Sequence, residues 1–320
     1  MPDGAERRVA PRPRRPSIGL ALGGGAARGW AHIGVIRQLV EAGFAPDVIA
    51  GTSIGAVVGG CYAAGGLDEL ESFARDLSKR RVIGLLDFHF GGSGLITGDR
   101  LAKLLMRGFG DTRIEDLPRR FVCVSTELRT GHEIWLSKGE LVQSMRASYA
   151  LPGLFKPVRV LDRWLIDGAL VNPVPVSVCR AFGARLVIAI NLNTDMFGKG
   201  TVVRAHDPVE TCPGDTDADW PDEAHTGVDG ARGLLRRQLV GTRAGPPGIS
   251  SVMVDAFNIV QDRIARSRLA GDPPDIMVTP KLADIGMFEF HRAREAIDAG
   301  ARAGDRILAE IEGTLTALAR

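Results

Sequence analysis

The chain has 320 residues and a mass of 34.2 kDa, which is enough for one large α/β domain or two modest ones. Forty basic and 38 acidic residues leave a net charge of +2, which argues against a general nucleic-acid binder, since such proteins carry a strongly basic domain. Forty glycines predict many tight turns or close backbone approaches, and only six histidines restrict metal binding and His-based catalysis.

The N-terminal segment 1–16 is rich in arginine and precedes an apolar run at 18–22. Glycines end that run too early for a signal peptide, so we expect a disordered basic arm that is able to touch anionic lipid. Four scattered cysteines without a CxxC pair indicate reduced thiols, and the sequence has no run of 18 apolar residues of the kind that predicts a membrane-spanning helix. We therefore expect a cytoplasmic protein.

Strand and helix patterns alternate near the start of the chain. Ile18–Leu22 predicts a buried strand, and a glycine turn and a helix over Gly29–Glu41 follow it. Val48–Ala50 predicts a second strand, which leads into a helix of small residues over Ile54–Ala64. Two such strand–turn–helix units are typical of a mainly parallel sheet covered by helices.

The rest of the chain continues this α/β pattern. Strands are predicted at Phe121–Ser125, Ile134–Leu136, Leu186–Asn191 and Ile276–Thr279, with a hairpin of Arg159–Leu161 and Arg163–Ile166 around Asp162. Helices are predicted at Asp99–Arg107, Leu141–Ser148, Val252–Arg268 and Phe288–Gly300. The apolar stripe of the helix that starts at Val252 is interpreted as a core contact or a dimer contact.

A different composition marks the segment at about 198–248. Residues 207–230 carry eight carboxylates and no lysine or arginine, among Pro, Gly and Thr. So few apolar residues cannot offset the entropy of ordering, and we predict a mobile insertion, with a lid over an active site as the alternative.

A candidate nucleophile lies between the second strand and its helix. Gly51-Thr52-Ser53-Ile54-Gly55 is a GxSxG, in which a sharp strand-to-helix turn exposes the serine and the glycines permit close packing. The following helix N-terminus favours developing negative charge. We therefore predict that Ser53 is a nucleophile and that Gly51 and Gly55 support its turn.

Two interpretations compete for the glycine loop Gly23-Gly24-Gly25-Ala26-Ala27-Arg28-Gly29. A dinucleotide site would use its small residues together with Asp47 as a ribose-binding acid, but Arg28 stands where a small residue is needed. Free backbone amides at the start of a helix would instead form an oxyanion hole. The second glycine turn, which carries Ser53, favours the oxyanion hole.

The base that would activate Ser53 has two candidates. A triad of Ser53, Asp167 and His291 has an allowed chain order, although His291 falls in a helical pattern that indicates a packing residue. Asp167-Gly168-Ala169 follows a predicted strand, and small residues after the acid allow it to approach a serine. In a dry pocket, the pKa of this carboxyl rises toward the range of a general base.

These motifs together resemble the patatin-like phospholipases, and in particular the small bacterial members similar to the esterase domain of neuropathy target esterase. The resemblance rests on the glycine loop through Gly34, on the GxSxG, on the segment Ala147–Pro157 and on Asp167-Gly168-Ala169. Near the C-terminus, the stretch from Gln261-Asp262-Arg263 through Pro273-Pro274-Asp275 is also similar to this branch of the family. It covers about 17–193 and 250–312, and it implies one three-layer α/β/α domain over 17–312 with a C-terminal tail at 313–320.

The resemblance also implies a Ser–Asp dyad. Ser53 would be the nucleophile and Asp167 its base, with Gly168 and Ala169 in support. The oxyanion hole would come from the glycine loop, assigned to Gly23, Gly24, Gly25, Ala26, Arg28 and Gly29, with Arg28 bracing it. No metal and no cofactor is implied.

The activity implied is hydrolysis of acyl esters of lipids, of the phospholipase A or lysophospholipase type. The expected partners are a lipid or acyl-ester substrate, the inner face of a membrane through peripheral contact, and a second copy in a homodimer, with no nucleic acid. A glycine-interrupted apolar stretch from Val82 to Ile96 is a candidate acyl slot, with core packing as the alternative. The alternative function is a non-catalytic or weakly catalytic adaptor of the same fold that binds a regulatory protein.

Overall fold

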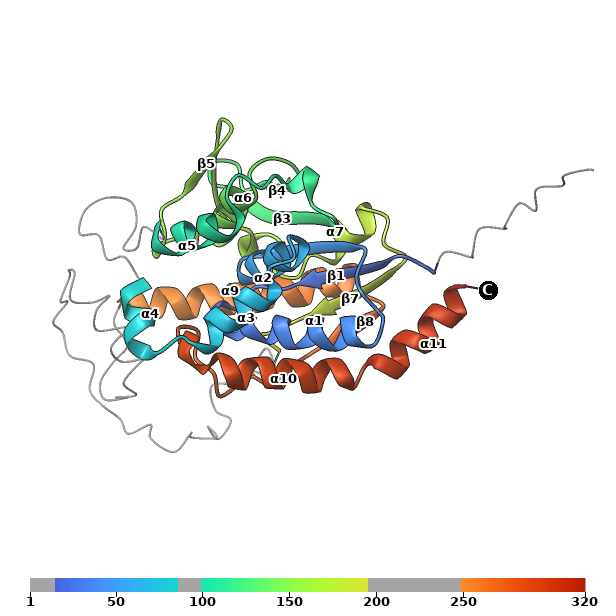
Figure 1. Cartoon of the computed structure of the whole chain (residues 1–320). Helices are drawn as coiled ribbons and strands as arrows, with labels where there is room; N and C mark the ends of the chain where they lie inside the picture. The colour runs from blue at the N-terminus through green and yellow to red at the C-terminus, as the bar shows by residue number, and fades with distance from the viewer. Residues whose placement is uncertain (1–14, 86–98, 195–248, 320) are drawn as a thin grey trace, which may run out of the picture.

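The structure, a computed structural model, describes residues 15–85, 99–194 and 249–319 (Figure 1). Within these ranges, eight strands form one sheet in the order β5–β6–β3–β2–β1–β7–β8, and β4 also pairs with β3. The strands are β1 Ile18–Leu22, β2 Val48–Thr52, β3 Arg120–Glu127, β4 Glu133–Leu136, β5 Val158–Val160, β6 Arg163–Asp167, β7 Leu186–Ile190 and β8 Ile276–Val278. Every strand predicted from the sequence is therefore present.

The centre of the sheet is parallel and one side of it is antiparallel. β3, β2, β1, β7 and β8 run in the same direction, with Leu22 of β1 opposite Gly51 of β2. β4 and β6 run antiparallel to β3, and β5 runs antiparallel to β6. The carboxyl ends of the parallel strands consequently meet at one edge, where ligand sites of open α/β sheets form.

Ten α-helices surround the sheet in the described ranges. They are α1 Ala31–Glu41, α2 Ile54–Ala63, α3 Leu67–Arg75, α4 Lys79–Leu85, α5 Asp99–Phe109, α6 Leu141–Ser148, α7 Val176–Ala181, α9 Ile249–Gly271, α10 Ala293–Asp305 and α11 Leu308–Leu318. Short 3-10 helices occur at η1 Ala26–Trp30, η2 Ile114–Asp116, η3 Gly168–Leu170 and η4 Phe290–Arg292.

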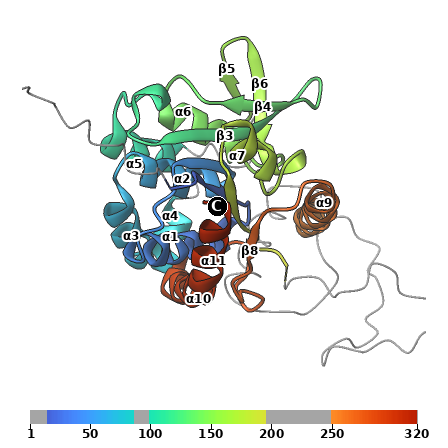
Figure 2. The same cartoon turned by 90° about the vertical axis from the view of Figure 1, so that its right-hand side faces the viewer.

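The helices cover both faces of the sheet, because alternate residues of a buried strand point to opposite sides. Leu20 and Leu22 of β1 join the core under α1, α2, α6 and α10. Ala21 between them faces the other side, where residues of α7 and α9 pack. Figure 2 shows α9 on the side of the sheet opposite α1 and α10. The predicted three-layer α/β/α fold is confirmed.

The C-terminal region differs from the sequence prediction. The helix predicted from Phe288 begins only at Ala293, because the chain first turns where Glu289 accepts a hydrogen bond from the amide of Gly286. The tail expected at 313–320 is helical as far as Leu318, since α11 crosses that boundary and packs Ile311 into the core. Helices α3, α4 and α7 were not predicted either.

Several expectations lie outside the described residues. The basic arm 1–16 is described only from Arg15, and the insertion predicted at 198–248 falls within the undescribed range 195–248. Across the described helices, none combines the length and the apolar character that crossing a membrane requires.

Candidate active site

Ser53 occupies a sharp turn between β2 and α2. Its backbone has φ 56° and ψ −123°, a conformation that L-residues rarely adopt, and Ser53 occupies the N-cap position of α2. Gly55 makes this turn sterically possible, because a Cβ there would lie 2.2 Å from the carbonyl oxygen of Leu22. Gly51 packs against the first turn of α2 in the same way. The turn holds the Ser53 hydroxyl at the carboxyl edge of the sheet.

A second serine holds the Ser53 backbone in place. The amide of Ser53 donates to Oγ of Ser148 at 2.9 Å, and that hydroxyl donates to the carbonyl of Val124 at 2.5 Å. Ser148 is fully buried at the end of α6. The strained turn is therefore tied to strand β3 through the side chain of Ser148.

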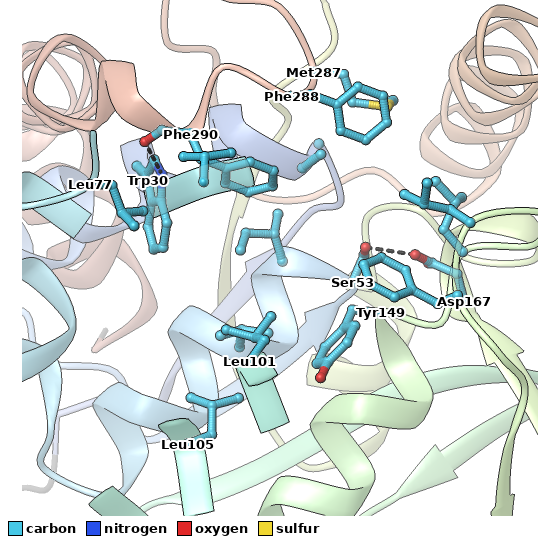
Figure 3. Close-up of a pocket in the computed structure, with 18 of the residues that line it drawn as sticks. Trp30, Ser53, Leu77, Leu101, Leu105, Tyr149, Asp167, Met287, Phe288 and Phe290 are labelled. Carbon is cyan, nitrogen blue, oxygen red and sulfur yellow. Dashed lines mark hydrogen bonds between the residues drawn. The ribbon is translucent and has the colours of Figure 1, made fainter. Parts of the chain in front are cut away.

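Asp167 ends β6 and faces Ser53. The Ser53 hydroxyl donates to Oδ2 of Asp167 at 2.7 Å (Figure 3). The amide of Ala169 donates to Oδ1 at 2.9 Å, so both carboxyl oxygens have a donor. Burial raises the pKa of Asp167 from 3.8 to about 7, although these two hydrogen bonds lower it in part. This places the carboxyl group in the range where a general base works near neutral pH.

Antiparallel pairing brings Asp167 to the serine. Its backbone pairs with Ser125 of β3, and its carbonyl accepts a hydrogen bond from the Thr126 hydroxyl at 2.8 Å. Gly168 then lies so close to β3 that a Cβ would stand 2.2 Å from the carbonyl oxygen of Val124. A side chain at this position would push Asp167 away from the sheet.

The glycine loop joins β1 to η1 beside the serine, but most of its amides are already used. The amide of Gly23 donates to the carbonyl of Ile190 at 3.1 Å, and that of Gly24 to Pro173 at 3.0 Å. The amide of Arg28 donates to a carbonyl within the loop at 3.2 Å. The prediction that these three residues supply oxyanion amides is therefore wrong, because those donors bind the protein's own carbonyls.

Two loop amides remain for a ligand. Gly25 and Ala26 line the same cavity as Ser53, and their amides have no acceptor among the described residues. A Cβ on Gly24 would lie 3.5 Å from the Cβ of Ser53, which shows how closely the loop approaches the serine. Gly29 packs against Ile54, the first residue of α2. The geometry thus narrows the candidate oxyanion donors to Gly25 and Ala26.

Buried polar side chains brace the loop. Arg28 donates to the carbonyl of Ile285 at 3.0 Å and to Oδ1 of Asn193 at 2.6 Å, and burial lowers its pKa to about 10. Asn193 in turn contacts Gln261 of α9. The bracing role expected of Arg28 agrees with these contacts.

His32 is buried behind the loop. Its Nε2 lies 2.8 Å from the carbonyl oxygen of Gly23, and burial lowers its pKa to about 4. A neutral ring that donates from Nε2 fits this contact, so His32 supports the loop backbone and does not face the serine.

An apolar cavity of about 130 Å³ opens beside Ser53 and Asp167. Its walls are mostly aliphatic and aromatic carbon, and Trp30, Leu77, Leu101, Leu105, Met287 and Phe288 are among the lining side chains (Figure 3). Val82, from the predicted acyl slot, also lines it, whereas the side chains of the rest of that stretch lie outside the described residues. Such a lining suits a hydrocarbon chain.

Neither alternative interpretation of the motifs fits this geometry. Asp47 lies just before β2 and accepts a hydrogen bond from the Ile18 amide at 2.8 Å, so it is at the edge of the sheet opposite the glycine loop. His291 lies in η4 and does not line the cavity, while Asp167 uses its oxygens for Ser53 and Ala169. Within the described ranges, no three His, Cys, Asp or Glu side chains are grouped to hold a metal ion.

The sequence interpretation assigned no role at the site to three residues that support it. Ser148 lies in the segment Ala147–Pro157, which we used only for the family resemblance, and no local pattern indicates its bond to Ser53. Asn193 and Gln261 brace the loop from two distant segments. A polar residue just after a buried parallel strand, as Asn193 is after β7, is a signal that could have indicated the site.

A family model and sequence relatives agree with the motifs. A family model described as "Patatin-like phospholipase" matches residues 20–180. The chain is 33% identical to an uncharacterized NTE family protein of Mycobacterium tuberculosis, and the match covers 89% of each chain. It is 34% identical over 192 residues to lysophospholipase nte1 of Emericella nidulans, covering 58% of this chain and 12% of that protein. Among solved structures it is similar to VipD from Legionella pneumophila, with a TM-score of 0.46 and 12% identity over 93% of this chain and 67% of that one.

Proposed function

This chain belongs to the patatin-like phospholipase family, and from that premise we propose that it hydrolyses acyl esters of lipids through Ser53 and Asp167. One observation carries the proposal: the Ser53 hydroxyl donates to a buried carboxyl group at 2.7 Å, at the edge of an apolar cavity. Similarity to lysophospholipases supports a lipid as the source of the ester.

The first half of the proposed reaction forms an acyl-enzyme. Ionised Asp167 accepts the hydroxyl proton as Ser53 Oγ attacks the ester carbonyl carbon. The resulting oxyanion accepts hydrogen bonds from the amides of Gly25 and Ala26, and the dipole of α2 adds to its stabilisation. The bond to the leaving alcohol or lysolipid then breaks, and that group takes the proton from Asp167.

The second half repeats these steps with water. Asp167 removes a proton from water, the hydroxide attacks the acyl carbonyl, and the same amides bind the second oxyanion. Ser53 leaves and regains the proton, and the carboxylic acid product is released. The carbon-lined cavity holds the acyl chain in both halves and keeps bulk water from the carboxyl group.

Hydrolysis of lysophosphatidylcholine and of a soluble short-chain nitrophenyl ester tests the proposal. Ser53→Ala should reduce both activities to background with the fold intact, and Asp167→Asn should be nearly as damaging. His291→Ala should retain most of the activity. Unchanged turnover in Ser53→Ala, or a loss confined to His291→Ala, would contradict the dyad.

A further inference from the structure

An apolar residue stands exposed at the tip of the β5–β6 hairpin. Leu161 is 89% exposed, the highest value among the exposed large apolar residues of the described ranges. The hairpin projects from the body of the molecule (Figure 1). Trp164 and Leu128 beside it are each 53% exposed, and the Leu128 amide donates to the Trp164 carbonyl at 2.8 Å. These three side chains form what we call the hairpin apolar tip.

The backbone at Leu161 is unfavourable for leucine. Its φ is +53°, and it is the first residue of the two-residue turn between Val160 and Arg163, a position where a positive φ is usually met by glycine. An exposed leucine in this conformation gains no burial within the chain. The strained backbone at Leu161 does not stabilise the fold, so it indicates that Leu161 contacts another molecule.

The hairpin extends beyond the same edge of the sheet at which Ser53 and Asp167 lie. Thr52 pairs with Val124 of β3, and further along β3 Asp167 pairs with Ser125. Because β6 is antiparallel to β3, its first residues lie beyond the carboxyl edge where Ser53 stands. At about 3.3 Å per residue, the tip reaches roughly 15–20 Å from Asp167.

Basic side chains surround the hairpin apolar tip. Arg159 lies directly across the ladder from Trp164, so the two share the outward face of the hairpin. Arg163 forms an ion pair with Glu127 at 2.9 Å, and the positive charge of Arg129 also helps to lower the pKa of Glu127. With Asp162, which pairs with Arg159, there are three arginines against two carboxylates. An exposed aliphatic residue, a tryptophan and arginines are the side chains favoured at a lipid–water interface.

We propose that the hairpin apolar tip inserts into an anionic lipid surface and so positions the dyad cavity at that surface. This inference rests on the proposed function, since it specifies how the enzyme reaches substrate held in a bilayer. Leu161 enters the acyl region, Trp164 lies at head-group depth, and the arginines contact lipid phosphates.

The test measures co-sedimentation of the full chain with vesicles of equal parts phosphatidylcholine and phosphatidylglycerol. Leu161→Gly, which fits the positive φ, should lower the partition coefficient about tenfold, as expected for losing one buried leucine. Arg159→Glu should lower it on these vesicles and much less on phosphatidylcholine alone. Val40→Ala removes another exposed apolar residue, at the far end of α1, and should change nothing.

Measuring hydrolysis of both a soluble ester and a vesicle lipid distinguishes a failure of this inference from a failure of the proposed function. Hydrolysis of the soluble ester should be unchanged in Leu161→Gly, while hydrolysis of lipid in vesicles should fall in parallel with binding. Undiminished vesicle binding in both tip variants would overturn the inference, as would a dimer in solution that Leu161→Gly dissociates. The soluble-ester activity of Ser53→Ala tests the dyad independently of vesicle binding.

Discussion

Replacing Asp167 by asparagine should stabilise the protein while it removes nearly all of the activity. The carboxyl group is buried, and burial raises its pKa from 3.8 to about 7. Asparagine has nearly the same shape, so its Oδ1 accepts from the Ala169 amide, and its Nδ2 donates to the Ser53 hydroxyl. The variant therefore keeps the packing and removes only the need to ionise a buried group.

The pKa of Asp167 sets the size of the stability difference between Asp167→Asn and the wild type. A group whose pKa is raised by folding contributes stability that is fully present below its unfolded value of 3.8 and is lost as the pH rises through about 7. The pKa difference between 3.8 and about 7 means that the wild type has lost about 4 kcal/mol of folding stability at pH 8. At pH 4.5 it has lost only about 1 kcal/mol. The stability of Asp167→Asn relative to the wild type should thus increase by about 3 kcal/mol between these pH values.

Urea unfolding followed by tryptophan fluorescence, at pH 4.5 and at pH 8, measures this difference. The midpoint of the wild type should fall relative to that of the variant as the pH rises, with the slope of each transition unchanged. A stability difference that is the same at both pH values would show that Asp167 does not titrate in this range. A variant less stable than the wild type at pH 8 would refute the reasoning.

Three further predictions follow from the site. The kcat/KM for a soluble ester should rise as Asp167 loses its proton near pH 7, and a profile flat from pH 5 to 9 would exclude this base. Ser148→Ala should lower kcat about tenfold because it leaves the Ser53 amide unpaired, whereas Ser144→Ala, whose hydroxyl donates to the carbonyl of Glu140 just before α6, should not. Gly168→Ala should destabilise the protein by about 1–3 kcal/mol by overpacking, whereas Gly108→Ala, which meets open space in α5, should stabilise it by about 0.5–1 kcal/mol, as calorimetry can establish.

Local patterns were sufficient to predict the strands and the sharp turn that carries Ser53. The strands β1, β2 and β7 are continuous apolar runs because both of their faces are buried, and such runs are visible in one sequence. Ser53 lies on a turn whose glycines are spaced by the geometry of the turn itself. Asp167 is followed by Gly168 for a similar steric reason.

Features that depend on distant pairing were not predictable. Ser53 meets Asp167 across 114 residues and Ser148 across 95, so these contacts follow from sheet register and not from local pattern. The glycine loop looked like a row of free amides, because the sequence does not indicate that Ile190 and Pro173 accept from two of them. Helix α7 has only six residues, which is too short for a helical period to be visible.

The central claim is that Asp167 activates Ser53 as a nucleophile. Intact-mass analysis after treatment with a fluorophosphonate, followed by peptide mapping, tests it most directly. We predict a single covalent adduct on Ser53 that forms rapidly in the wild type and in His291→Ala, forms slowly in Asp167→Asn, and is absent in Ser53→Ala. A wild-type protein that forms no adduct, or one that carries it on another residue, would contradict the claim.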